Sequence, residues 1–148
     1  VPVDLAALAR EAAQRGAAEA QARGIRLEHA GDAPVLVHGQ PDALAVLLRN
    51  LVDNALRYSP DGAVVRVTVG GTSGGHGATL VVEDSGPGLP PEALARLGER
   101  FYRVLGTGQA GSGLGWSIVQ RLVRLYGIHV VVERSPGLGG LRVDLAWS

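Results

Sequence analysis

Four short motifs follow one another along this chain, and their order and spacing constrain its fold more than any other feature. They are Asn-Leu-Val-Asp-Asn-Ala at 50–55, Asp-Ser-Gly-Pro-Gly at 84–88, Arg-Phe-Tyr-Arg at 100–103 and Gly-Ser-Gly-Leu-Gly at 111–115. Two of them are rich in glycine, which lets another group approach the backbone closely because it has no Cβ. We expect one domain that brings these polar groups and glycines together at the ends of its helices and strands.

The composition excludes several classes of protein. With 148 residues and a formal net charge of zero, the chain suits a single domain and lacks the basic face of a nucleic-acid binder. It has no cysteine for a disulfide or a thiolate metal site, and its four histidines show no metal-ligand spacing. Every basic residue is an arginine, which excludes a Walker-type phosphate loop because that loop needs a lysine.

Hydrophobic periodicity predicts three long helices and six short strands. The helices are expected at 5–23, between Asp4 as N-cap and Gly24, at 41–58, and at 114–126, before Gly127. A brief helix is expected at 90–97, inside an irregular segment of the kind that often forms a lid. The expected fold is α+β: a two-layer sandwich in which three helices cover one face of a mixed, mostly antiparallel sheet of about five strands. The strands are predicted at 25–29, 35–38, 64–69, 78–83, 129–133 and 141–146.

Two asparagines stand four residues apart in the second predicted helix. Asn50 and Asn54 therefore share a face, which borders the apolar stripe of that helix. They are either two solvated polar residues or a row of neutral oxygens and amides beside a cleft. In the second case their oxygens suit Mg²⁺, and Arg57, on the same edge, would neutralise phosphate charge.

Asp84 and the glycine motifs offer a second set of candidate groups. Asp84 follows an apolar strand and either begins an ordinary turn or accepts a hydrogen bond from an adenine amino group, with Gly86 and Gly88 letting the base approach. A second motif opens the third helix, where free N–H groups suit phosphate. It is not a dinucleotide fingerprint, because it follows a loop and not a strand. Its members are Gly111, Ser112, Gly113, Leu114 and Gly115.

The segment between the two glycine motifs contains Phe101, the only phenylalanine of the chain. It is either a small hydrophobic anchor flanked by solvated arginines or the anchor of a lid. In the second case Arg103 would reach the terminal phosphate of a nucleotide.

Taken together, these segments resemble the N, G1, F and G2 boxes of the ATP-binding catalytic domain of bacterial sensor histidine kinases, a branch of the GHKL superfamily with the Bergerat-type ATP-binding fold. The resemblance covers nearly the whole chain. It implies that Asn54, with Asn50, contacts Mg²⁺ and phosphate. Arg57 stands where the family usually has lysine, so it keeps the charge but not the geometry, and Trp116 replaces a small or aliphatic residue. The resemblance further implies that Tyr58 flanks the nucleotide, Asp84 binds adenine, Leu89 packs near the base and Gly113 to Gly115 hold phosphates.

The resemblance implies a function for these residues. The chain would bind Mg-ATP and donate its γ-phosphate to a histidine, with Asn50, Arg57 and Arg103 taking part in catalysis. ATPases of the wider superfamily commonly carry a glutamate at the position of Asn50, which cannot act as a general base. A stand-alone ATPase, an anti-sigma-factor-like protein-serine kinase and a degenerate nucleotide-binding module remain as alternatives.

The histidine that would accept the phosphate is not evident in this chain. None of the four histidines has the sequence context of a phosphoacceptor, and the chain does not begin with methionine. We therefore expect residues 1–148 to be one catalytic domain, monomeric by itself, from a longer homodimeric kinase that also holds the dimerisation and phosphoacceptor domain. The domain would be cytoplasmic, the parent protein would lie in the bacterial inner membrane, and a response regulator would be the indirect partner; no nucleic-acid partner is expected.

Overall fold

The computed structural model describes residues 2–31, 34–71, 77–86 and 112–147. The side chains of Tyr58 and of residues 112–117 are not part of that description. Several predictions therefore lie outside the described residues: the brief helix at 90–97, Gly88, Leu89, the segment with Phe101 and Arg103, and Gly111.

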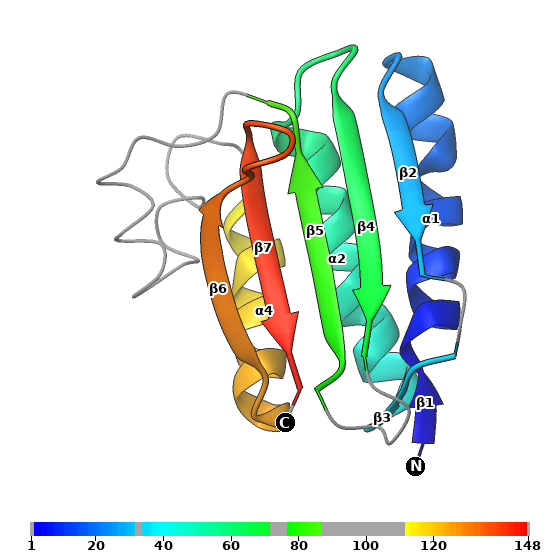
Figure 1. Ribbon diagram of the computed structural model, residues 1–148, viewed down its shortest axis with the longest axis vertical. Coiled ribbons are helices and arrows are strands. Elements are labelled where there is room, and N and C mark those ends of the chain that lie inside the picture. The colour runs from blue at the N-terminus through cyan, green and yellow to red at the C-terminus, as the bar shows by residue number, and fades with distance from the viewer. Residues whose placement is uncertain (1, 32–33, 72–76, 87–111, 148) are drawn as a thin grey trace.

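The described residues form two layers, one of helices and one of strands (Figure 1). Helices α1 (Leu5–Ala22), α2 (Pro41–Tyr58) and α4 (Ser112–Tyr126) cover one face of a five-stranded sheet. Strand β2 is parallel to β4, and the remaining neighbours are antiparallel. This confirms the predicted fold class. In sheet order the strands are β2 (Arg26–Ala30), β4 (Val64–Gly70), β5 (Thr79–Asp84), β7 (Leu141–Ala146) and β6 (His129–Arg134).

One predicted strand lies outside this sheet. Strand β3 (Leu36–His38) pairs antiparallel with β1 (Pro2–Asp4), a strand that the sequence did not predict. Asp4 belongs to β1 and also caps α1, because its Oδ1 accepts hydrogen bonds from the N–H groups of Ala6 and Val35. The expectation of one sheet was wrong here, because alternation of apolar and polar residues indicates a strand but does not specify which strand it pairs with.

The core lies between the layers. Leu44, Leu47, Leu48 and Leu51 form the predicted apolar stripe of α2, and all four are almost fully buried. They face the sheet side chains that point toward the helices, which alternate along each strand as a half-buried sheet requires. Those include Val65, Val67, Leu80, Val82, Val143 and Leu145.

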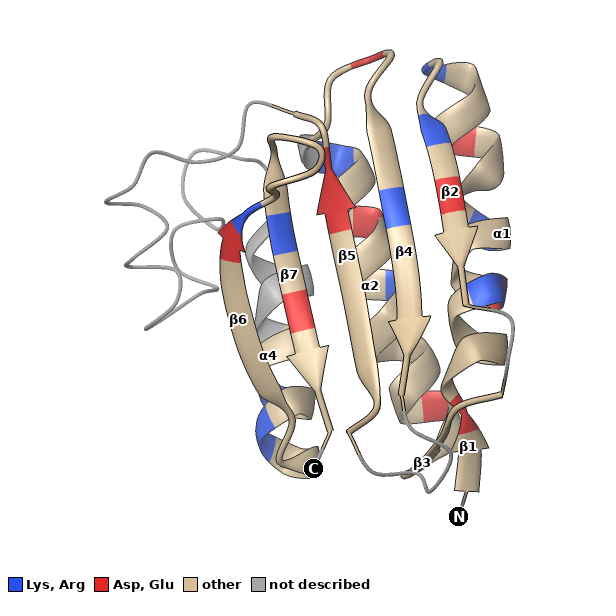
Figure 2. Cartoon of the chain, in the orientation of Figure 1, with Lys and Arg blue, Asp and Glu red and all other residues tan. Residues whose placement is uncertain are grey.

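The other face of the sheet carries a row of alternating charges (Figure 2). The strand registers align Glu28, Arg66, Glu83, Arg142 and Glu133, one from each strand in sheet order. Arg66 Nε lies 2.9 Å from Glu28 Oε1, and Arg142 Nε lies 3.6 Å from Glu133 Oε1. Opposite charges on neighbouring strands stabilise the pairing modestly and keep this face compatible with water, which explains why helices cover only one side.

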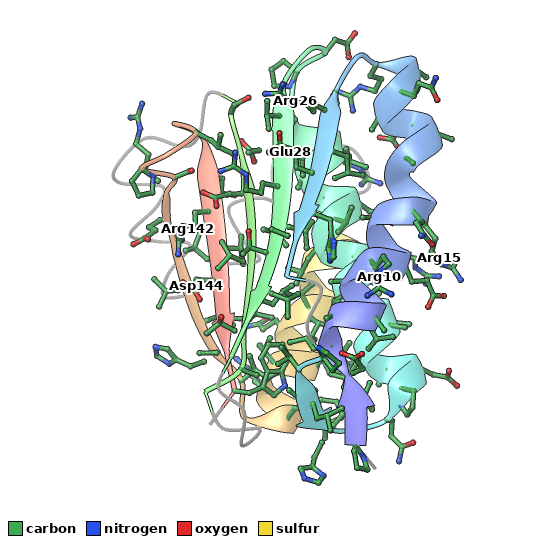
Figure 3. The ribbon with its side chains drawn as sticks, turned by 45° about the vertical axis from the view of Figure 1, so that its right-hand side comes forward. Arg10, Arg15, Arg26, Glu28, Arg142 and Asp144 are labelled. Carbon is green, nitrogen blue, oxygen red and sulfur yellow. The ribbon has the colours of Figure 1, made fainter. Side chains whose placement is uncertain are left out.

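Two further ion pairs lie on this charged face, one within strand β2 and one within strand β7 (Figure 3). Arg26 pairs with Glu28 at 3.1 Å, and Arg142 pairs with Asp144 at 3.2 Å.

Within the described part of the chain, no helix has the length and apolar character that crossing a membrane requires.

Arg23 joins the end of α1 to the end of α2. Its Nη1 donates to the main-chain oxygen of Leu56 at 2.6 Å, and its Nη2 donates to that of Ser59. Its Nε also donates to Asp61 Oδ1 at 2.9 Å. A cation at the C-terminus of a helix meets carbonyl groups that have no partner within the helix, so Arg23 fixes the end of α2.

We expect Arg23→Gln to lower the free energy of unfolding by roughly 1–3 kcal/mol, because the variant loses charge-assisted hydrogen bonds at the end of α2. Urea denaturation measures the change. Arg15→Gln is the matched control: among the described residues Arg15 makes only an exposed pair with Glu11 at 3.7 Å, and its loss should change stability by less than about 1 kcal/mol. Equal losses in the two variants would contradict the role of Arg23.

Candidate functional site

Helix α2 brings Asn54 to the middle of the molecule. The helix begins at Pro41, which suits a first helical position, and its leucine stripe fixes its rotation against the sheet. Asn54 borders that stripe and is only 4% exposed. Its Nδ2 is buried and has no hydrogen-bond partner among the described residues. A buried amide in this state costs folding free energy, so a ligand that supplies an acceptor would satisfy it.

Strand β5 delivers Asp84 to the same place. The side chain is 6% exposed and points toward the helices, in phase with Val82. Its Oδ1 accepts a hydrogen bond from the N–H of Gly86 at 2.9 Å and another from the N–H of Leu141 at 3.3 Å. Both donors among the described residues meet Oδ1, which leaves Oδ2 as the oxygen available to a ligand.

Asn54 and Asp84 line one small pocket between α2 and the sheet. Its volume is about 20 Å³, room for roughly one water molecule and less than a purine occupies. The described residues therefore supply one wall of a site for a larger ligand. The wall combines an apolar surface with a carboxamide and a carboxyl group, as ligand pockets commonly do. Its members are Leu51, Asn54, Ala55, Val82, Asp84, Leu141 and Val143.

The environment of Asp84 changes its acidity. Burial raises the pKa of its carboxyl group above the ordinary value, while the N–H groups of Gly86 and Leu141 lower the pKa and Glu83 adds a smaller increase. The raised pKa means that the folded state prefers the protonated carboxyl more than the unfolded state does. The contribution of Asp84 to stability is therefore complete at low pH and is lost as the pH rises through the folded-state pKa.

We expect the stability of Asp84→Asn relative to the wild type to increase as the pH rises from about 3 to about 7. Asparagine keeps an acceptor for the two N–H groups but never ionises, so only the wild type loses stability through this group. Urea midpoints across this range measure the difference. A flat or falling difference for Asp84→Asn would contradict the assignment.

The other residues predicted on α2 lie apart from this pocket. Asn50 is half-buried, one turn before Asn54, and its Nδ2 donates to the main-chain oxygen of Val46 at 2.8 Å. It does not line the pocket. Arg57 is exposed. Their predicted roles toward phosphate and Mg²⁺ remain predictions.

The structure describes some of the glycines that the motifs predicted for the site. Gly86 lies two residues after Asp84, and a Cβ on Gly86 would lie 3.1 Å from Asp84 Oδ1 and 3.2 Å from Pro60 Cδ. Its lack of a side chain thus makes room for the carboxyl group. Helix α4 begins at Ser112, two residues before the predicted start, so Ser112, Gly113, Leu114 and Gly115 form its first turn. Their predicted contact with phosphate remains a prediction.

A larger cavity, of about 270 Å³, lies between α1 and α2. None of the residues predicted to bind ligand lines it. Its charged lining residues are all exposed and carry both signs, namely Glu11, Arg15, Asp42 and Arg49. Exposed mixed charges do not select a ligand, so the smaller pocket is the better candidate.

The sequence did not identify the contribution of the β6–β7 hairpin to the site. Leu141 and Val143 line the pocket, and the N–H of Gly140 donates to the main-chain oxygen of Asp84 at 3.0 Å. The only signal in the sequence is the pair Gly139-Gly140 before the last strand, and such a pair is typical of an ordinary turn.

The protein family that the sequence matches is consistent with a nucleotide site at this place. A family model described as histidine kinase-, DNA gyrase B-, and HSP90-like ATPase matches residues 39–146, and the chain belongs to that family. Within it, the relatives that it resembles are sensor histidine kinases, as the four motifs predicted.

Three relatives illustrate the likeness. The sensor protein QseC of Escherichia coli K12 is 50% identical over 109 residues, which are 74% of this chain and 23% of QseC. The structure of the mycobacterial sensor histidine kinase MprB has a TM-score of 0.78 at 29% identity and covers 99% of this chain and 95% of that one. Full-length ShkA in complex with AMPPNP has a TM-score of 0.75 at 29% identity, over 100% of this chain and 31% of that one. The chain thus spans about a quarter of the length of the first curated relatives that it matches.

Proposed function

We propose that this chain binds Mg-ATP in the pocket of Asn54 and Asp84 and donates the γ-phosphate to a histidine of a separate phosphoacceptor domain. The observation that carries the proposal is that one apolar wall holds a buried carboxyl group and a buried carboxamide whose Nδ2 has no hydrogen-bond partner in the described part of the chain. The complex of ShkA with the ATP analogue AMPPNP supports a nucleotide as the ligand.

The two polar side chains suit different parts of ATP. Asp84 Oδ2 would accept a hydrogen bond from the exocyclic amino group of adenine, while Leu51, Ala55 and Val143 would give the base an apolar surface. Asn54 would offer its oxygen to Mg²⁺ and its Nδ2 to a phosphate oxygen. No group of three His, Asp or Glu side chains within the described ranges could hold a metal ion, which fits an ion that arrives with the phosphates and keeps several waters.

We assign the remaining steps to the other residues that the sequence predicts for the site. Phosphoryl transfer depends on positioning and on stabilising charge that spreads over the transferred group. The first turn of α4, with Gly113 and Gly115, would place free N–H groups near the phosphates. Arg57, Asn50 and Arg103 would add polar or cationic groups, Tyr58 and Leu89 would flank the base, and Gly88 and Gly111 would line the approach.

The proposed parent protein is a homodimeric sensor kinase of the inner membrane with this domain in the cytoplasm. Its own dimerisation domain would present the acceptor histidine, and a response regulator would then receive the phosphate. The related kinases motivate this arrangement, since one solved relative is the cytoplasmic segment of histidine kinase QseC.

Incubation of the chain with γ-labelled ATP and Mg²⁺, with and without a separately produced acceptor domain of the parent protein, tests the proposal. We expect label on the acceptor domain only when both are present, in an acid-labile bond to histidine. Asp84→Ala serves as the impaired control. Rapid phosphate release without an acceptor would instead favour a stand-alone ATPase, label on a serine would favour a protein-serine kinase, and absence of nucleotide binding would favour a degenerate module.

A further inference from the structure

The β6–β7 hairpin holds Asp84 by two backbone groups. The N–H of Gly140 donates to the main-chain oxygen of Asp84 at 3.0 Å, and the N–H of Leu141 donates to Oδ1 of the same residue at 3.3 Å. Gly140 is buried. The N–H groups of Leu141 and Gly86 together occupy Oδ1 and fix the plane of the carboxyl group, while the N–H of Gly140 holds the main chain of Asp84.

Gly140 is required for space and not for its backbone conformation. Its φ does not lie in the left-handed region, in contrast to that of Gly139 at +89°. A Cβ on Gly140 would overlap both Oδ1 and the main-chain oxygen of Asp84, and it would lie 2.7 Å from the nitrogen of Gly86. Backbone atoms cannot move aside cheaply, so a side chain here would displace the carboxyl group of Asp84.

The hairpin is itself anchored beside Asp84. Ser135 is 1% exposed, and its hydroxyl donates to Glu83 Oε1 at 2.6 Å and accepts the N–H of Leu138 at 3.0 Å. The N–H of Ser135 donates to the oxygen of Gly140 at 2.7 Å. Because Glu83 directly precedes Asp84, this network fixes the hairpin relative to the end of β5.

We infer that Gly140 and Leu141 are positioning residues that determine which base this site accepts. The N–H groups of Leu141 and Gly86 occupy Oδ1, and Gly140 holds the main chain of Asp84 and leaves space for its carboxyl group. Oδ2 is then the oxygen directed toward the ligand, so that the site selects a purine with an amino group at its six-position. This inference rests on the proposed binding of ATP. It adds that selectivity for the amino group depends on a hairpin 57 positions away in sequence from Asp84.

The test compares ATP with purine riboside triphosphate, which lacks the six-amino group, by calorimetric titration. We expect Gly140→Ala to weaken ATP binding by about tenfold or more while changing the affinity for the analogue by less than about threefold. Gly137→Ala is the matched control in the same hairpin, because a Cβ there would meet nothing within 4 Å and its φ is not left-handed. It should bind both nucleotides like the wild type.

If Gly140→Ala lost affinity for both nucleotides equally, or lost affinity for neither, the inference would be overturned. Circular dichroism checks folding, and if Gly140→Ala does not fold, Ser135→Ala replaces it. That variant keeps Gly140 but frees the hairpin from Glu83, and it should again lose affinity for ATP and not for the analogue. A wild-type chain that binds neither nucleotide would instead contradict the proposed function, so the two failures are distinguishable.

Discussion

Asp84→Ala is expected to weaken ATP binding by at least about tenfold. The variant loses the acceptor for the adenine amino group, and a hydrogen bond to a charged group contributes about 1.5–3 kcal/mol. It also leaves the N–H groups of Gly86 and Leu141 without their acceptor. Calorimetric titration of the purified chain with ATP measures the effect.

Asp144→Ala is the control for that experiment. Asp144 is an aspartate of the neighbouring strand β7, but it lies on the open face and pairs with Arg142 at 3.2 Å. Its loss should leave ATP affinity unchanged. If Asp84→Ala binds ATP as tightly as the wild type, Asp84 does not bind the base.

Asn54→Ala is expected to weaken the binding of ATP while leaving the stability of the fold nearly unchanged. Because Nδ2 of Asn54 is buried without a partner among the described residues, its removal should change the free energy of unfolding by less than about 1 kcal/mol. Affinity for ATP in the presence of Mg²⁺ should nevertheless fall by roughly tenfold, because the variant loses an oxygen for the ion and a donor for the phosphates. Titrations with Mg²⁺ and with EDTA, together with urea denaturation, measure both quantities.

Gln21→Ala provides the control, since it removes an exposed amide from α1. It should affect neither stability nor binding. Two results would count against the role of Asn54: a large loss of stability with normal affinity, or equal ATP affinities with and without Mg²⁺ in both the wild type and Asn54→Ala.

Local patterns in the sequence were sufficient to predict most of the fold. The long helices and the sheet strands lie within two residues of their predicted bounds, because helix caps and alternating strands depend on neighbours in sequence. Asp4 caps α1, and Gly24 and Gly127 follow α1 and α4 with φ of +66° and +64°. These glycines stop helices by adopting the left-handed conformation.

Contacts between distant segments could not be predicted in the same way. Arg23 reaches carbonyl groups 33 and 36 positions away, and in the sequence it is only one of fourteen basic residues. The pairing of β1 with β3 has the same origin. Long-range contacts of this kind depend on how the elements pack, which single-sequence periodicity does not encode.

The residues of the candidate site fall into the same two groups, those with a local signature in the sequence and those whose role arises only from packing. Asn54 and Asp84 each belong to a motif with a local signature, and the structure brings both to one pocket. The hairpin residues Gly140 and Leu141 have no such signature, because their importance arises only where β7 lies beside β5. Asn50 shows the reverse: the helical spacing placed it correctly one turn from Asn54, but its amide donates within its own helix.

A crystal structure of the chain with Mg²⁺ and a non-hydrolysable ATP analogue tests the central claim most directly. We predict that the adenine amino group lies within hydrogen-bond distance of Asp84 Oδ2, with Asn54 beside the ion and the phosphates. A nucleotide bound elsewhere, for example in the groove between α1 and α2, would contradict the account, as would a pocket filled by the side chains of the protein itself.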